Sequence, residues 1–316
     1  MEKNFALVLG GGGAAGNAWL IGVCAGLAEQ GLDVARLADA IYGTSAGATA
    51  AAQLRGGPSI AELYAATQAP PAAPAGPGGG RAAGGPNGPD GRQHSGTGPG
   101  GDPRAVFERM RAIGAAASSA LDVSRGMGAF ALESDPSLAP RAAARLAQVA
   151  SRLPSQQWPE RYVGIAAVDA LSGELVVLDR ECGASLAEAV AASTSLPGGT
   201  ASVPIAGRRY VDGGVFSADN AQLGSGFERV IVLSPLTRPE ESAAPRQFEG
   251  LRREDAWGTT LGSQVAALRS GGSVVTVIHP DDEALAVFGA NLTSTGIRPA
   301  AAREGYRQGR AADVGR

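Results

Sequence analysis

The chain has 316 residues, 44% of them hydrophobic and 18% charged, an ordinary globular balance that can bury one large core or two modest ones. Its net charge of −3 gives no general attraction for nucleic acid, so we expect no nucleic-acid partner. No signal peptide and no strongly apolar run of about 20 residues is visible. Cys24 and Cys182 fit no metal spacing and indicate reduced core thiols. We therefore expect a cytoplasmic protein, with at most peripheral contact with a membrane.

The first predicted element is a strand, Phe5-Ala6-Leu7-Val8-Leu9, whose apolar run is typical of a strand buried on both faces of a mostly parallel sheet. It leads into a glycine loop, residues 10–16, and then into a predicted helix from Ala18 to Gln30. Backbone N–H groups at such a helix N-terminus attract negative charge, either a cofactor phosphate or the oxyanion of an acyl-transfer intermediate. The spacing Gly11-x-Gly13-x-x-Gly16 also fits a dinucleotide-binding loop.

A second predicted strand, Asp39-Ala40-Ile41-Tyr42, is followed by Gly43-Thr44-Ser45-Ala46-Gly47 and a predicted helix from Ala46 to Leu54. Strand, Gly-x-Ser-x-Gly turn and helix form the context in which a nucleophilic serine hydroxyl is exposed. The alternative is that Ser45 only opens the helix. A dinucleotide site expects an acidic residue at the end of this second strand, where the serine turn stands instead, and this favours the oxyanion interpretation.

Residues 69–103 are dominated by Pro, Gly and Ala and have no periodic apolar face, which predicts a disordered insertion; a mobile lid is the alternative. His94 lies within this segment, where nothing holds it in place, so we do not expect it to be catalytic. The remaining predicted elements alternate as in a layered α/β fold. They are helices at Pro103–Leu121, Ser137–Leu153, Ser185–Ser195 and Leu251–Ser270, strands at Tyr162–Val168, Glu174–Leu178, Arg229–Ser234 and Val274–Ile278, a strand into Asp212, and terminal helices.

Asp212-Gly213-Gly214 supplies a candidate carboxylate base for Ser45. Serine nucleophiles usually need a histidine base, and besides His94 the chain has only His279. The order Ser45, Asp212, His279 imitates an α/β-hydrolase triad, so that mechanism stays open. Asp-Gly is also a common turn pair, and Arg208-Arg209-Tyr210-Val211 would then be one arm of a hairpin.

Two further groups of polar residues have alternative interpretations. Ser193, Thr194 and Ser195 either line a pocket or simply end a helix. Asp281, Asp282 and Glu283 look like a helix start with favourable first-turn charge.

With its glycine loop, its serine turn and its Asp212 triplet, the chain resembles the patatin-like phospholipases, a family of lipid acyl hydrolases. The resemblance extends over most of the chain except residues 69–103. It implies a three-layer α/β/α fold with a mostly parallel central sheet, and one catalytic domain over residues 1–316. It implies Ser45 as nucleophile and Asp212 as its base in a Ser–Asp dyad. The oxyanion-binding amides would be Gly11, Gly12, Gly13 and Ala46, and the supporting motif glycines Gly43, Gly47, Gly213 and Gly214.

The sequence departs from the family at Ala15, where relatives commonly have Arg or Lys. We therefore expect a neutral or simple ester substrate, or a phospholipid whose head group is held elsewhere. The expected activity is hydrolysis of a lipid or small ester through an acyl-enzyme, with neither cofactor nor metal. The alternatives are acyl transfer to an acceptor other than water, the Ser-Asp-His esterase, and a nucleotide-binding module that uses only the glycine loop.

Overall fold

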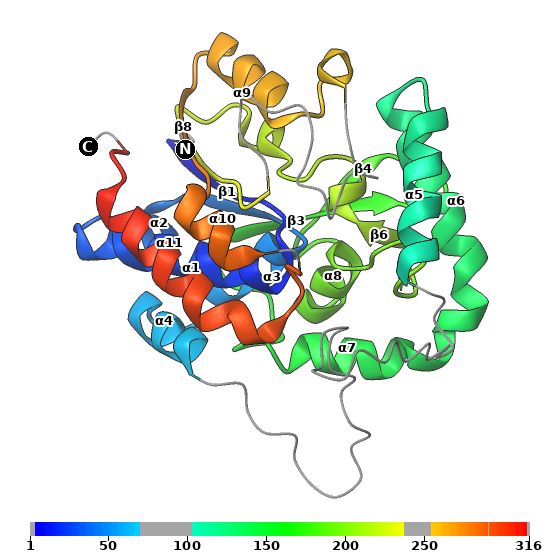
Figure 1. The fold of residues 1–316 in the computed structure, drawn as a ribbon, viewed down its shortest axis with the longest axis horizontal. Coiled ribbons are helices and arrows are strands. Elements are labelled where there is room, and N and C mark those ends of the chain that lie inside the picture. Colours follow the sequence, from blue (N-terminus) through cyan, green and yellow to red (C-terminus); the bar gives the residue numbers. More distant parts are fainter. Residues whose placement is uncertain (1–3, 70–102, 237–253, 290, 315–316) are drawn as a thin grey trace, which may run out of the picture.

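The computed structural model describes residues 4–69, 103–236, 254–289 and 291–314, and strands within these residues form one sheet (Figure 1). The strands are β1 Phe5–Leu9, β2 Ala40–Thr44, β3 Tyr162–Asp169, β4 Leu175–Leu178, β5 Val203–Ile205, β6 Arg208–Asp212, β7 Arg229–Leu233 and β8 Val274–Ile278. Each strand pairs with the next in the series β5-β6-β3-β2-β1-β7-β8, and β4 also pairs with β3. The pairs β3–β2, β2–β1, β1–β7 and β7–β8 are parallel. The pairs β3–β4, β3–β6 and β5–β6 are antiparallel. The central sheet is therefore mostly parallel, as expected.

Helices cover both faces of this sheet (Figure 1). They are α1 Gly13–Glu29, α2 Val34–Leu37, α3 Ala46–Arg55, α4 Ile60–Gln68, α5 Pro103–Ala116, α6 Ala120–Leu138, α7 Ala142–Ala150, α8 Leu186–Ser193, α9 Leu261–Ser270, α10 Asp282–Phe288 and α11 Arg298–Ala311. Leu7 and Leu9 of β1 pack in the core that contains α1, α3 and α8, and Ala6 and Val8 pack on the opposite face with α9. Because successive strand residues face opposite sides, both layers are built on the same strand. The three-layer α/β/α fold is confirmed.

The first and last long helices, α1 and α11, lie against each other at very short range (Figure 1). A Cβ atom added at Gly22 of α1 would lie 2.1 Å from the carbonyl oxygen of Ala302 in α11. One added at Gly305 of α11 would lie 2.2 Å from that of Trp19. The contacts run in the same direction along both helices, from Arg298 beside Asn17 onward. The two helices are therefore parallel, and their N-termini lie at the same end.

Three predicted helices have different bounds in the structure. The helix predicted over 103–121 ends at Ala116, and α6 then begins because the Ser119 hydroxyl accepts the Asp122 N–H at 3.1 Å. The helix predicted over 137–153 is divided in the structure: residues 137–138 are the end of α6, a 3₁₀ turn that contains Pro140 follows, and α7 ends at Ala150. The helix predicted from Leu251 begins at Leu261, where Thr260 caps it.

Two predicted bounds next to the glycine motifs are also wrong. Helix α1 begins at Gly13 instead of Ala18, so the end of the glycine loop is its first turn. Strand β2 extends to Thr44, directly before Ser45. Most of the predicted insertion, residues 70–102 with His94, lies outside the described residues.

The two cysteines are both free, but they differ in burial. Cys24 is buried, as expected of a core thiol, whereas Cys182 is only half-buried, because it follows β4 near the surface. Within the part of the chain that the structure describes, no helix is long and apolar enough to cross a membrane.

Candidate active site

Ser45 occupies a sharp turn between β2 and α3. Its backbone has φ 53° and ψ −111°, in the left-handed range that non-glycine residues rarely adopt. Its N–H donates to the Ser193 hydroxyl at 2.9 Å, so α8 holds the turn from outside. A Cβ atom at Gly47 would lie 2.0 Å from the carbonyl oxygen of Leu9, and one at Gly43 would lie 2.4 Å from that of Gly47. The turn therefore needs both glycines, because neither position has room for a side chain.

Strand β3 brings Asp212 next to this turn. Thr44 at the end of β2 pairs with Ala166, and Asp212 at the end of β6 pairs with the next residue, Ala167. Because β4 occupies the other edge of β3 over the same residues, β2 and β6 lie along one edge and meet end to end. The ends of two strands from distant parts of the sequence therefore deliver Ser45 and Asp212 to one place.

The hairpin considered from the sequence does exist, but Asp212 is not in its turn. Strands β5 and β6 are joined by Ala206 and Gly207, with φ 48° and 78°, as in a two-residue turn of the type that suits hairpins. Asp212 lies at the far end of β6, and its N–H donates to the carbonyl oxygen of Ser195 at 3.0 Å. Its position beside Ser45 thus follows from the strand and not from a turn.

The Asp212 carboxylate is buried, and its Oδ1 accepts the N–H of Gly214 at 2.8 Å. Burial raises the pKa of Asp212 to about 6. The bond from Gly214, a hydrogen bond with the Ser45 side chain and the positive charge of Arg145 act in the opposite direction on that pKa. At neutral pH this carboxylate is therefore ionised and yet more basic than an ordinary aspartate, which suits a general base.

The glycine loop lies at the N-terminus of α1, and a Cβ atom added at Gly11 would lie 3.7 Å from the Cβ of Ser45. The N–H of Gly11 already donates to the carbonyl oxygen of Ala218 at 2.8 Å. Among the described residues, the N–H groups of Gly12 and Gly13 have no hydrogen-bond partner, and Gly13 takes a positive φ of 61°. The N–H of Ala14, which also lines the cavity, has no hydrogen-bond partner among these residues either, so the loop keeps three amides free, those of Gly12, Gly13 and Ala14.

A cavity of about 590 Å³ unites these groups. Of the residues predicted from the sequence, those that line it are Ser45, Asp212, Gly11, Gly12, Gly13, Ala46 and Gly214. Gly43, Gly47 and Gly213 instead allow close backbone packing behind it; a Cβ at Gly213 would lie 2.5 Å from the carbonyl oxygen of Ala166. The lining residues that the sequence did not indicate include three arginines, Arg145, Arg152 and Arg298. No local motif marks them: Arg145 and Arg152 lie in and just after α7, and Arg298 begins α11.

His279 is not among the described residues that line this cavity. It follows β8, its Nδ1 lies 3.3 Å from the carbonyl oxygen of Pro280, and it lines a separate surface pocket with Arg307. The structure therefore brings Ser45 and Asp212 together without His279.

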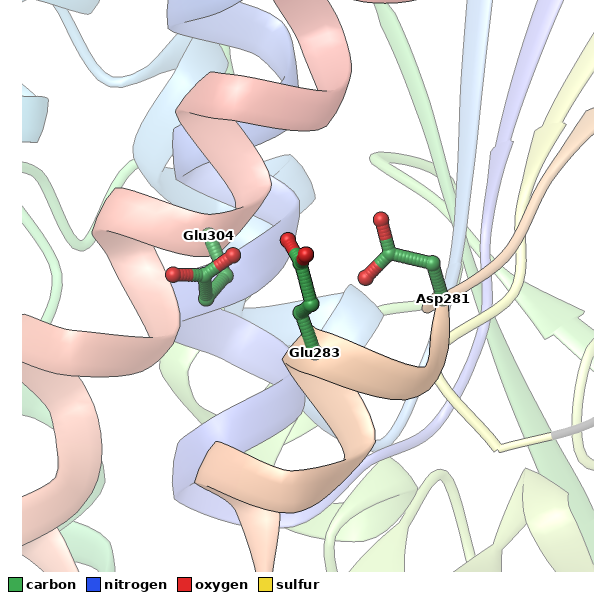
Figure 2. Close-up of side chains that lie close together, drawn as sticks. All are labelled: Asp281, Glu283 and Glu304. Carbon is green, nitrogen blue, oxygen red and sulfur yellow. The ribbon is translucent and has the colours of Figure 1, made fainter.

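One acidic cluster has carboxylate oxygens close enough together for a metal ion. It consists of Asp281, Glu283 and Glu304, from the start of α10 and from α11 (Figure 2). Arg307 forms ion pairs with all three, at 2.5, 3.0 and 2.8 Å, and so neutralises much of their charge. Asp281 also accepts the N–H of Ala284 as the cap of α10, which confirms the predicted helix start. The cluster is thus explained by one arginine and one helix cap.

A family model described as patatin-like phospholipase matches residues 7–223, which is more than half of the chain. The chain therefore belongs to the patatin-like phospholipase family. A comparison with curated proteins found no match. Among solved structures, the chain is similar to the crystal structure of VipD from Legionella pneumophila, with 13% sequence identity and a TM-score of 0.43. That similarity covers 98% of this chain and 66% of the VipD chain, so the chain spans just under two thirds of that length.

Proposed function

We propose that this protein is a serine-dependent lipid acyl hydrolase that cleaves carboxylic esters through an acyl-enzyme. The observation that carries the proposal is the pairing, in one cavity, of a serine on a strained turn with a buried carboxylate whose pKa is raised to about 6. Membership in a family named for phospholipase activity supports the choice of a lipid ester. The catalytic dyad consists of Ser45 and Asp212.

The reaction has two halves. In the first, the Ser45 Oγ attacks the ester carbonyl carbon while Asp212 takes the hydroxyl proton. The tetrahedral intermediate then expels the alcohol, which leaves with that proton, and Ser45 keeps the acyl group. In the second, Asp212 takes a proton from water, the resulting hydroxide attacks the acyl-enzyme, and Ser45 recovers its proton as the carboxylic acid leaves. Because Asp212 returns to its ionised form each time, no histidine is needed.

The negative charge that forms on the carbonyl oxygen needs donors that are already in place. The amides of Gly12 and Gly13 meet this need, since both line the cavity and neither has another partner among the described residues. The amide of Ala46, the first residue of α3, is the third donor we assign. All three lie at helix N-termini, where the dipole also favours an anion.

The experiment that tests the proposal is labelling of folded protein with a fluorophosphonate, followed by assay of ester hydrolysis. We expect stoichiometric labelling that maps to Ser45 and a parallel loss of esterase activity. Ser195→Ala is a matched control, because Ser195 lies just after α8, next to Thr194, but its hydroxyl donates to the carbonyl oxygen of Ala191 in α8. Labelling that survives in Ser45→Ala, or an absence of both labelling and hydrolysis in folded wild type, would contradict the proposal.

A further inference from the structure

Arg145, Arg152 and Arg298 give the catalytic cavity a concentration of positive charge. Among the described residues, none of the three forms an ion pair with a carboxylate, and Asp212 is the only acid that lines the cavity. Besides burial, the charge of Arg152 lowers the pKa of both Arg145 and Arg298, so Arg152 is close enough to each of the other two guanidinium groups to repel it. Like charges gathered in this way favour the binding of an anion.

Arg145 has an unused donor at this place. Its Nη2 donates to the Thr194 hydroxyl at 3.0 Å. Thr194 directly follows Ser193, whose hydroxyl accepts the Ser45 N–H, so this bond fixes the guanidinium close to the serine turn. Its Nη1 is buried and has no hydrogen-bond partner among the described residues. A buried N–H group without an acceptor is costly, and an oxygen of a bound anion would remove that cost.

Arg298 is held in position before any ligand arrives. Because α1 and α11 run parallel, it lies beside the start of α1, where it donates to Asn17 Oδ1 at 2.8 Å. The Asn17 amide in turn donates to Gln53 Oε1 of α3 at 3.0 Å. Three helices therefore fix this guanidinium, so little side-chain entropy is lost when it binds a ligand.

These arginines also supply the positive charge that the sequence lacks at Ala15. Ala15 is fully buried in the core and does not line the cavity, so an arginine there would have to displace core packing. The positive charge at this site comes from Arg145, Arg152 and Arg298 instead. The sequence-based alternative of a head group held elsewhere is therefore the one that the geometry favours.

We propose that Arg145, Arg152 and Arg298 form a head-group subsite that selects a lipid ester with a phosphate monoester over one with a zwitterionic choline head group. The inference rests on the proposed ester hydrolysis. A phosphate monoester carries a charge of about −1.5 to −2 at neutral pH and offers several oxygens to guanidinium groups. A choline ammonium would be repelled by the same three arginines.

The test compares kcat/KM for phosphatidate and phosphatidylcholine with identical chains, each dilute in neutral detergent micelles at pH 8, where Asp212 is ionised. We expect wild type to prefer phosphatidate by about tenfold or more, and Arg152→Gln and Arg145→Gln each to lower that preference by about tenfold. Arg152 is exposed, so its variant is the one whose folding is safest. Arg141→Gln is the matched control: Arg141 is an exposed arginine just before α7 that does not line the catalytic cavity. Arg141→Gln controls for the general attraction of a surface arginine to a negatively charged micelle. Its preference for phosphatidate over phosphatidylcholine should stay within about twofold of that of wild type.

A binding experiment on Ser45→Ala separates this inference from the proposed function, because it needs no turnover. Calorimetry should detect glycerol 3-phosphate but not glycerol, and Arg152→Gln should weaken that binding about tenfold. The subsite is overturned if folded protein binds no glycerol 3-phosphate, or if the arginine variants slow both lipids equally. Tighter binding of inorganic phosphate, with an unchanged lipid preference in the variants, would overturn the head-group assignment. Loss of all hydrolysis with intact arginine-dependent binding would contradict only the proposed esterase.

Discussion

The backbone N–H of Ser45 donates to the side-chain hydroxyl of Ser193 at 2.9 Å. This bond joins the serine turn to the last residue of α8, from a part of the chain far from β2. Because Ser45 has a positive φ, its backbone is stable only when the surroundings hold it. Ser193 is fully buried, and we infer that its role is to position the nucleophile without touching the substrate.

Ser193→Ala should lower kcat on a simple ester more than it raises KM. The substitution leaves the Ser45 N–H, which is partly buried, without its acceptor, so we expect a loss of about 1 kcal/mol of stability and a looser turn. The measurement is steady-state kinetics together with chemical denaturation. Ser195→Ala, which removes a buried hydroxyl two residues away, should keep kcat near wild type. Equal loss of kcat in both variants would show that the loss comes from disturbed packing and not from the hydrogen bond between Ser45 and Ser193.

The pH dependence of hydrolysis should follow Asp212. A general base must be ionised, so kcat/KM on a neutral ester should fall as the pH drops through about 6, the pKa to which burial raises this carboxyl. Because the charge of Arg145 lowers that pKa, Arg145→Gln should move the acidic limb to higher pH. A limb near pH 4, the ordinary value for aspartate, would contradict the assignment of Asp212 as the buried base.

Asp212→Asn should be more stable than wild type at high pH although it is inactive. The pKa rises from 3.8 unfolded to about 6 folded, so ionisation of Asp212 destabilises the native state as the pH rises between these values. The gain in unfolding free energy for the asparagine variant should reach about 3 kcal/mol at pH 8 and about half of that at pH 5. Urea denaturation at both values measures it. A gain that does not grow with pH would mean that the carboxylate is not disfavoured by burial.

His279→Ala should leave ester hydrolysis within about twofold of wild type, since His279 lines a different pocket from Ser45. Asp212→Asn should instead lower kcat by at least about 10³-fold, the scale seen when a member of a catalytic unit is removed. Both variants are assayed on the same soluble ester at pH 8. If His279→Ala falls as far as Asp212→Asn, the Ser-Asp-His mechanism replaces the dyad.

The parts of the site that could be predicted from sequence are those with local patterns. The apolar runs of β1, β7 and β8 and the glycines around Ser45 each constrain the backbone within a few residues. Helix α6, residues Ala120–Leu138, was not predicted, since no element was assigned between Leu121 and Ser137; its N-cap Ser119 lay inside the helix predicted over 103–121. A helix cap can be seen in a few residues of sequence, but whether a helix begins at that cap depends on how the helix then packs.

The contributions of Ser193 and of the arginines could not be predicted, because they depend on pairs that are distant in sequence. Ser193 reaches Ser45 only through the packing of α8. Arg298 reaches the cavity only because α11 lies parallel to α1, a packing that glycines such as Gly22 allow. In the same way, no local pattern shows that β3 aligns the end of β2 with the end of β6.

The most direct test of the central claim is to trap the acyl-enzyme. Wild type is mixed with 4-nitrophenyl butyrate, quenched in acid within milliseconds to seconds, digested with trypsin and analysed by mass spectrometry. We expect a butyryl group on Ser45 within the tryptic peptide of residues 37–55, a burst of nitrophenolate, and neither signal in Ser45→Ala. A butyryl group on another residue, or turnover by Ser45→Ala at the wild-type rate, would contradict the account.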